Sequence, residues 1–466
     1  MLSGTFGTIV AYIIGFATLP LITHFYKPEH IGTWQILFGL VSLLTPVATL
    51  RFEDALVLEK SKKVIARLLS VVIINTCIIV ILLLIASLLI GSEELTIVNL
   101  KINQSLLVMA VIGVIMQVGF LIFNALIIKD KKFKIQAISK ILGSIAIPTI
   151  ALVALLLTNA SKQTYIIAAL AALFFQSIIL FIFTNKQYFV SVFKWNKNKT
   201  KKAIKKYRVY PAYMVPYALS QGFIWQVTLL MLGILFSTST VGAYTVARQL
   251  VFMPVSLLTT GLKQVVFSYA STAPKYDKTV NKRIRFLLKN LINLIIPLGV
   301  FSFFYISDII NYVLGEDWEQ VGVFSKWIMI PAIALMLTSW LDRIFDVYGK
   351  QKLAVLLQVT SDVVLLILLA FCYFFKADAQ TVVITISLFL TIYNIIWLFI
   401  VLFILKFETS FWGNLLFRIT TIAVTFFFFM MLLDATLTNS FALTLKLLIL
   451  ALSSYYTFSK MRTHNK

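Results

Sequence analysis

Long apolar segments separated by short polar loops follow one another along almost the whole chain. A helix needs about 20 mostly apolar residues to cross the hydrocarbon core of a bilayer. Windows of about 19 residues that meet this requirement predict about fourteen membrane-spanning helices, and we expect an all-α polytopic membrane protein. The expected spans are 3–25, 31–50, 68–90, 105–128, 138–158, 164–185, 211–236, 241–267, 287–310, 322–345, 353–375, 381–405, 414–434 and 441–459.

The composition excludes the usual classes of soluble protein. Of the 466 residues, 60% are hydrophobic and only 13% are charged, whereas about a quarter of the residues in a soluble domain are charged. This excludes a water-soluble catalytic domain and a disordered chain. The two cysteines exclude a disulfide scaffold, and the three histidines form no cluster with metal-ligand spacing. We therefore expect no metal and no organic cofactor.

Lysine and arginine gather in alternate loops. The chain has 41 Lys+Arg against 18 Asp+Glu, and 32 of the 41 lie in loops on the side of the C-terminus. Because cytoplasmic loops collect these residues, we expect both termini in the cytoplasm, and the net charge of +23 needs no nucleic-acid partner. The inner loops are 51–67, 129–140, 186–208, 271–289, 346–352, 406–418 and 460–466, whereas the outer loops hold only Lys27, Lys101, Lys162 and Lys376.

The chain divides into two similar parts. Gly32 and Trp34 follow the first outer loop, and Gly242 and Tyr244 recur at the same place in the second part. Both parts begin in the same inside-to-outside sense, which is typical of parallel transporter repeats related by a pseudo-two-fold axis, with a cavity between two bundles. The expected domains are an N-terminal six-helix bundle (1–185), a basic cytoplasmic linker at the anionic inner leaflet (186–210), a C-terminal six-helix bundle (211–405) and an appended two-helix hairpin with a cytoplasmic tail (406–466).

A family resemblance is carried by the segment Leu50-Arg51-Phe52-Glu53-Asp54-Ala55-Leu56-Val57-Leu58. It resembles the Arg-aromatic-Glu-x-Ala signature after the second span of bacterial oligosaccharide flippases, which belong to the multidrug/oligosaccharidyl-lipid/polysaccharide (MOP) exporter superfamily. Segments 241–257, 314–318 and 343–352 are also similar to this family. The chain differs from the signature at Phe52, which replaces a tyrosine, and at Glu59, which replaces a closing proline.

The resemblance implies a flippase that works by alternating access of its two bundles in the bacterial cytoplasmic membrane. Its implied substrate is an undecaprenyl-pyrophosphate-linked oligosaccharide repeat unit, carried from the inner to the outer leaflet for a surface polysaccharide such as O-antigen or capsule. The implied partners are this lipid-linked oligosaccharide, the membrane lipids and the other polysaccharide assembly proteins.

Two alternative functions stay open. One is a multidrug or cation-coupled exporter of the same superfamily, although cationic drugs would favour acids where this chain has cations. The other is a membrane-embedded polysaccharide polymerase or glycosyltransferase. No loop exceeds about 25 residues, and the sequence has no Asp-x-Asp motif and no glycine-rich phosphate loop. We therefore expect a transporter and not an enzyme.

Four cations within or beside the predicted spans form the candidate substrate site, namely Arg51, Arg248, Lys263 and Arg343. A cation at the centre of a membrane helix costs about 2.5–3.5 kcal/mol on insertion scales, so each needs a compensating role. We expect them to bind the substrate diphosphate. If span two continues as a helix through residue 58, as the apolar run 55–58 permits, Arg51 also lies about 10 Å inside. Trp225 is a candidate for stacking on sugar. The alternatives are packing for the tryptophan, and local ion pairs or snorkelling to an interface for the cations.

Three acids are candidates for gating or ion coupling. Glu53 could break and re-form a pair with the signature arginine as an inner gate opens. Asp362, inside the eleventh span, could carry a proton or a sodium ion, or could pair with a cation. Asp342 lies beside Arg343, which also has Asp346 three residues later, so a local ion pair is the alternative there.

Overall fold

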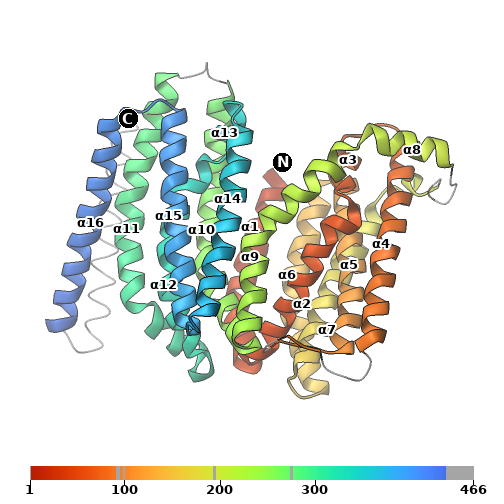
Figure 1. Ribbon diagram of the computed structural model, residues 1–466, viewed down its shortest axis with the longest axis horizontal. Helices are drawn as coiled ribbons and strands as arrows, with labels where there is room; N and C mark the ends of the chain where they lie inside the picture. Colours follow the sequence, from red (N-terminus) through yellow and green to blue (C-terminus); the bar gives the residue numbers. More distant parts are fainter. Residues whose placement is uncertain are drawn as a thin grey trace. The chain divides into compact units, whose positions relative to one another are not determined.

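The computed structural model describes residues 2–90, 95–97, 100–190, 192, 196–272 and 277–436. Nearly all of these residues are helical, which confirms the all-α polytopic class (Figure 1). The helices are α1 (Leu2–Phe25), α2 (Pro28–Thr49), α3 (Phe52–Leu58), α4 (Lys62–Ile90), α5 (Gln104–Lys129), α6 (Phe133–Leu157), α7 (Lys162–Phe183), α8 (Lys197–Lys206), α9 (Val215–Leu235), α10 (Thr238–Thr272), α11 (Lys278–Leu314), α12 (Glu319–Thr338), α13 (Ile344–Val347), α14 (Gln351–Phe374), α15 (Ala379–Ile404) and α16 (Thr409–Thr436).

Short elements join some of these helices. The sequence analysis does not predict the antiparallel hairpin of β1 (Leu95–Ile97) and β2 (Leu100–Ile102), because three-residue strands are too short to give a periodic pattern. The remaining short elements are the helical turns η1 (Lys186–Tyr188), η2 (Tyr210–Met214), η3 (Glu316–Trp318) and η4 (Ser339–Leu341).

Twelve helical segments in the described ranges are long and apolar enough to cross a membrane. A further candidate is a bent pair, Tyr210–Ser220 and Ile224–Leu235, whose two parts differ in direction by 53°. Together these correspond to the first thirteen expected spans. The fourteenth expected span, 441–459, lies outside the described residues.

The chain packs into two compact units, Met1–Thr245 and Val246–Lys466. In the first unit, α6 packs against α1 and α7, while α2 packs against α5 and α9. Leu37, Val41 and Val114 are fully buried in this core. Because α9 belongs to the first unit by its contacts, the boundary falls within α10, later in the chain than the basic linker 186–210.

A close helix contact in the first unit involves two glycines, Gly32 in α2 and Gly242 in α10. A Cβ atom added at Gly32 would lie 1.8 Å from the carbonyl oxygen of Thr238. One added at Gly242 would lie 1.8 Å from the carbonyl oxygen of Pro28. Only glycine lets the two backbones approach this closely, and small residues serve this purpose at helix contacts within membranes.

In the second unit, α11 packs against α12 and α16, and α12 packs against α15. Their shared core includes the fully buried side chains Leu288, Ile292 and Trp340. Large apolar side chains lie exposed on helices of both units, for example Leu89 in the first unit and Phe374 in the second. Such faces suit contact with lipid, since an aqueous surface rarely carries apolar patches of this extent.

Candidate transport site

The chain turns sharply after α2, at Leu50 and Arg51. Both residues have left-handed backbone conformations, with φ of 50° and 55°, and this conformation costs a non-glycine residue about 1–2 kcal/mol. Complete burial of Phe52 and Leu56 in α3 offsets the cost. Span two therefore does not continue as one helix through residue 58, because α2 and α3 are separate helices.

Arg51 stands at this turn and pairs with two carboxylates. Its Nη2 lies 2.9 Å from Oδ2 of Asp54, and its Nη1 lies 3.4 Å from Oε1 of Glu53. The two acids differ in environment, because the side chain of Glu53 is 6% exposed and that of Asp54 is 46% exposed. Burial raises the pKa of Glu53. The local ion pair that the sequence left open is therefore formed.

Glu59, which replaces the proline of the family signature, joins the α3–α4 connection to the basic linker. Its Oε2 accepts hydrogen bonds from Nζ of Lys206 at 2.5 Å and from the hydroxyl of Tyr207 at 2.7 Å. Its Oε1 accepts the N–H of Ser61 at 2.8 Å. The ammonium of Lys129 donates to the backbone carbonyl of Glu59. Four separate groups therefore converge on one residue.

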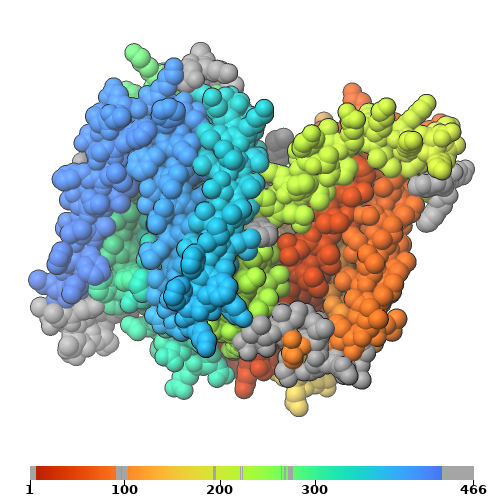
Figure 2. Space-filling model, in the orientation of Figure 1, coloured from red at the N-terminus to blue at the C-terminus, as the bar shows by residue number. Residues whose placement is uncertain are grey.

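These bonds determine the charge of Glu59. Burial on its own raises the pKa of this carboxyl group, but the hydrogen bonds from Lys206, Ser61 and Tyr207 outweigh burial and hold the pKa at about 2. The sequence analysis missed this role, although the departure from the signature marked the position. The bond from Lys206 anchors the end of α8, and Figure 2 shows α8 covering one end of α4.

In the second unit, Lys263 of α10 pairs with Asp342, which follows η4. The Nζ of Lys263 lies 2.9 Å from Oδ2 of Asp342, and both side chains are little more than a third exposed. The sequence had placed Asp342 beside Arg343. Instead, Arg343 Nη1 binds Asp346 Oδ2 at 3.0 Å, as the local alternative suggested. Two of the predicted site residues, Lys263 and Asp342, are thus in direct contact.

Asp362 lies in α14 and is only 7% exposed. Its Oδ1 accepts a hydrogen bond from the amide of Gln358 at 3.2 Å. The hydroxyl of Tyr393, from α15, donates in turn to the Gln358 amide oxygen at 3.3 Å. A buried carboxylate in a membrane helix needs compensation, and this polar chain supplies part of it.

Two further predicted residues lie on consecutive helices. Arg248 in α10 and Trp225 in α9 are partly buried, and both form contacts with neighbouring groups. Among the described residues, no group of three or more His, Cys, Asp or Glu side chains could hold a metal ion. The chemistry available to the described site is therefore that of ion pairs and hydrogen bonds.

The many long apolar helices define a multi-pass helical membrane protein. The structure is similar to "Lipid II flippase MurJ, inward closed conformation", with a TM-score of 0.71, 15% sequence identity and coverage of 100% of both chains. It is also similar to an inward-facing multidrug resistance MATE family transporter of the MOP superfamily, with a TM-score of 0.51, 12% identity and coverage of 91% of this chain and 96% of that one. A MOP superfamily transporter from Pyrococcus furiosus gives a TM-score of 0.52 at 14% identity, over 87% of this chain and 96% of that one.

At such low identities these likenesses establish the fold, and the sequence comparison establishes the family. The sequence model described as "Polysaccharide biosynthesis protein" matches residues 21–323, so the chain belongs to that family. A search of curated protein sequences found no match. The chain therefore belongs to a polysaccharide biosynthesis family and shares the fold of these solved structures, which agrees with the resemblance noted in the sequence.

Proposed function

We propose that this protein flips an undecaprenyl-pyrophosphate-linked oligosaccharide repeat unit from the inner to the outer leaflet of the bacterial cytoplasmic membrane. Both termini lie in the cytoplasm in this proposal, and the cycle is alternating access. Membership of a polysaccharide biosynthesis family supports a sugar-bearing substrate. The observation that carries the proposal is the pairing of the candidate cations with carboxylates, as Lys263 is with Asp342.

A carboxylate of the protein and a phosphate of the substrate can bind the same cationic side chain. Both groups accept hydrogen bonds from guanidinium and ammonium groups in the same geometry. Glu53 compensates Arg51 and Asp342 compensates Lys263, which lowers the cost of keeping cations near the membrane interior. An arriving diphosphate competes for the same donors. Arg51, Arg248, Lys263 and Arg343 are the proposed donors, and Trp225 offers a face for sugar stacking.

Exchange of partners also provides a route to ion coupling. When a diphosphate binds Arg51 or Lys263, the carboxylate that was paired with this cation needs a new positive partner. A proton or a sodium ion fills that need, and burial of Glu53 already favours its protonated form. Asp362, buried beside Gln358, is the third carboxylate proposed to bind the coupling ion. Release of substrate on the outer side restores the original pairs.

The test is a bacterial strain that lacks this gene. We expect the lipid-linked repeat unit to accumulate in the inner leaflet and the surface polysaccharide to disappear, with both effects reversed by the wild-type gene. Normal surface polymer in the deletion strain would reject the proposal. Loss of resistance to cationic dyes with unchanged polymer would favour the multidrug alternative. Accumulation of an incomplete repeat unit would indicate a glycosyltransferase.

A further inference from the structure

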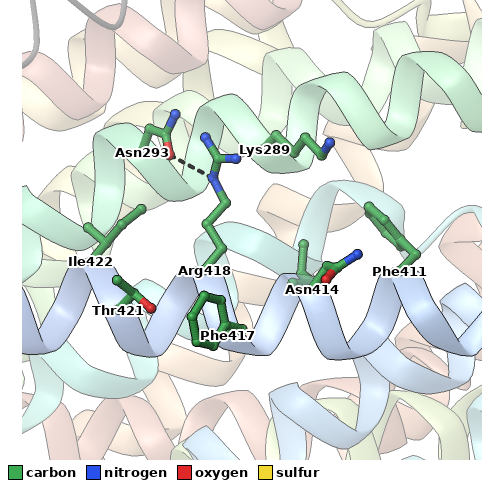
Figure 3. A pocket seen from close by; sticks show the side chains of 9 residues that line it. Lys289, Asn293, Phe411, Asn414, Phe417, Arg418, Thr421 and Ile422 are labelled. Carbon is green, nitrogen blue, oxygen red and sulfur yellow. Dashed lines mark hydrogen bonds between the residues drawn. The ribbon is translucent and has the colours of Figure 1, made fainter.

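A cavity of about 590 Å³ lies between α11 and α16, within the second unit. Its volume falls inside the range of about 300–1,000 Å³ that is usual for small-molecule sites. Lys289 and Asn293 line it from α11, and Asn414 and Arg418 line it from α16 (Figure 3). No residue of the proposed transport site lines this cavity.

The four polar residues form two short rows that face each other. Lys289 and Asn293 are four residues apart on one helix, and Asn414 and Arg418 are four apart on the other, so each pair shares a helix face. Nε of Arg418 donates to Oδ1 of Asn293 at 2.9 Å. Figure 3 shows the guanidinium of Arg418 reaching across to α11, beside Asn293 and on the side of Lys289. Its two terminal amino groups are left to bind a ligand.

The cavity carries two positive charges, Lys289 and Arg418, that no acidic side chain balances in the part of the chain that the structure describes. Within the described ranges, neither Lys289 nor Arg418 forms an ion pair with an acidic side chain. Two like charges that line one cavity repel each other. An anion bound between them removes this repulsion, and arginine and lysine are the usual donors to phosphate.

The position of the cavity selects an anion that carries a hydrocarbon chain. Lys289 lies three residues beyond Phe286, where the apolar part of α11 begins, which is about 4.5 Å along the helix. Arg418 lies about 10 Å beyond Phe411 by the same measure. Both residues therefore lie within about the first 10 Å of their apolar segments, from where long lysine and arginine side chains reach the lipid headgroups. Phe417 borders the cavity and is 72% exposed, so it offers an apolar surface that an acyl chain can cover.

We propose that the cavity between α11 and α16 binds the phosphate headgroup of an anionic phospholipid from the cytoplasmic leaflet. Arg418 and Lys289 bind the phosphate oxygens, the Asn414 amide faces the polar headgroup, and the acyl chains lie along Phe417. Basic pockets between membrane helices on the cytoplasmic side recognise anionic headgroups in this way. The loops before α11 and α16 belong to the lysine-rich and arginine-rich set, which places this end on the cytoplasmic side. The lipid then joins α16 to the rest of its unit.

The experiment measures lipid binding, so its result does not depend on whether the protein transports the proposed substrate. The full-length protein is purified in a neutral detergent and examined by native mass spectrometry with added phosphatidylglycerol, phosphatidylcholine or inorganic phosphate. We expect one retained phosphatidylglycerol, weaker retention of phosphatidylcholine and no displacement by inorganic phosphate. Equal retention of both lipids would overturn the proposal. Displacement by inorganic phosphate would also overturn it, because the site would then take a free anion.

Variants test whether the two cations carry the binding. The double variant Lys289→Gln and Arg418→Gln should reduce phosphatidylglycerol retention about tenfold or more, because two charge-assisted contacts are lost. The matched control Lys282→Gln and Lys350→Gln removes two exposed cations that do not line the cavity. If the double variant does not fold, the single variant Lys289→Gln replaces it. The Lys289 side chain is exposed, so its replacement should leave folding intact. Retention equal to the wild type in either cavity variant would contradict the proposal.

Discussion

Gly32 and Gly242 pack directly against each other at the start of α2 and near the start of α10. A Cβ atom added at Gly32 would lie 2.8 Å from the amide nitrogen of Gly242, and one added at Gly242 would lie 3.1 Å from the amide nitrogen of Gly32. These are the two glycines that recur in the sequence repeat. The contact is therefore reciprocal, because a Cβ atom added at either glycine would meet the backbone of the other.

Replacing either glycine should destabilise this contact. In Gly32→Ala and Gly242→Ala the new methyl group meets backbone atoms, which cannot rotate away, so we expect a loss of about 1–3 kcal/mol in stability. The melting temperature of the purified protein measures the effect. Gly261→Ala, on the same helix as Gly242, is the control because nothing lies within 4 Å of its added Cβ. A melting temperature unchanged in both contact variants would show that the helices separate readily.

The Glu59 cluster should hold α8 in a pH-dependent way. The pKa of Glu59 falls from 4.5 to about 2 in the folded protein, so its stabilising contribution is complete above about pH 4.5 and is lost as the pH falls through 2. We expect hydrogen exchange of α8 amides to accelerate over this range. Glu59→Gln should accelerate it at pH 7 and remove the dependence. The exposed Glu316→Gln is the control, and equal protection of α8 in Glu59→Gln would contradict the role.

The ion pair between Lys263 and Asp342 should matter more than the pair between Arg343 and Asp346. The first pair is about one third exposed, whereas the second is about half exposed. Asp342→Asn should cost about 1–3 kcal/mol, because it leaves a partly desolvated ammonium without its partner. Asp346→Asn should cost about 0–1 kcal/mol, as usual for a surface pair. Chemical or thermal unfolding of both variants compares them, and equal losses would reject the distinction.

Glu53 should make stability fall as the pH rises. Its folded-state pKa is raised, so the protonated form is favoured, and stability is lost as the pH rises from the unfolded pKa of about 4.5 through the folded value. Glu53→Gln should remove this part of the pH profile of the melting temperature. Asp54→Asn is the matched control, since Asp54 is the other partner of Arg51 and its side chain is about half exposed. If the pH profile of the melting temperature is unchanged in Glu53→Gln, the pH dependence arises from another group and the prediction is wrong.

The helices were predictable from the sequence because the length of an apolar segment is a local property. For the same reason, the pairs of Arg51 with Glu53 and of Arg343 with Asp346 could be anticipated, since the partners are two or three residues apart. Lys263, in α10, and Asp342, which follows η4, are 79 residues apart. Lys206 and Glu59 are 147 residues apart. No local pattern indicates such partners.

The turn at Leu50 and Arg51 was missed for a different reason. The segment from 55 to 58 is apolar and continues the helical pattern of span two, and neither turn residue is a glycine that would mark a left-handed backbone. Burial of α3 decides the conformation there, and burial is a property of the folded chain. For Gly32 and Gly242, the sequence repeat identified both residues but did not predict that they are in contact.

The central claim is that cations of this chain bind the diphosphate of a lipid-linked oligosaccharide during its movement across the membrane. The most direct measurement is the rate at which the protein, reconstituted in liposomes, moves a fluorescent undecaprenyl-pyrophosphate-linked oligosaccharide between leaflets. We expect movement by the wild type, a reduction of about tenfold or more in Arg248→Ala, and an unchanged rate in Lys326→Ala, whose ammonium lies 4.7 Å from the centre of the Phe303 ring. Equal rates for wild type and Arg248→Ala, or no movement by the wild type, would contradict the account.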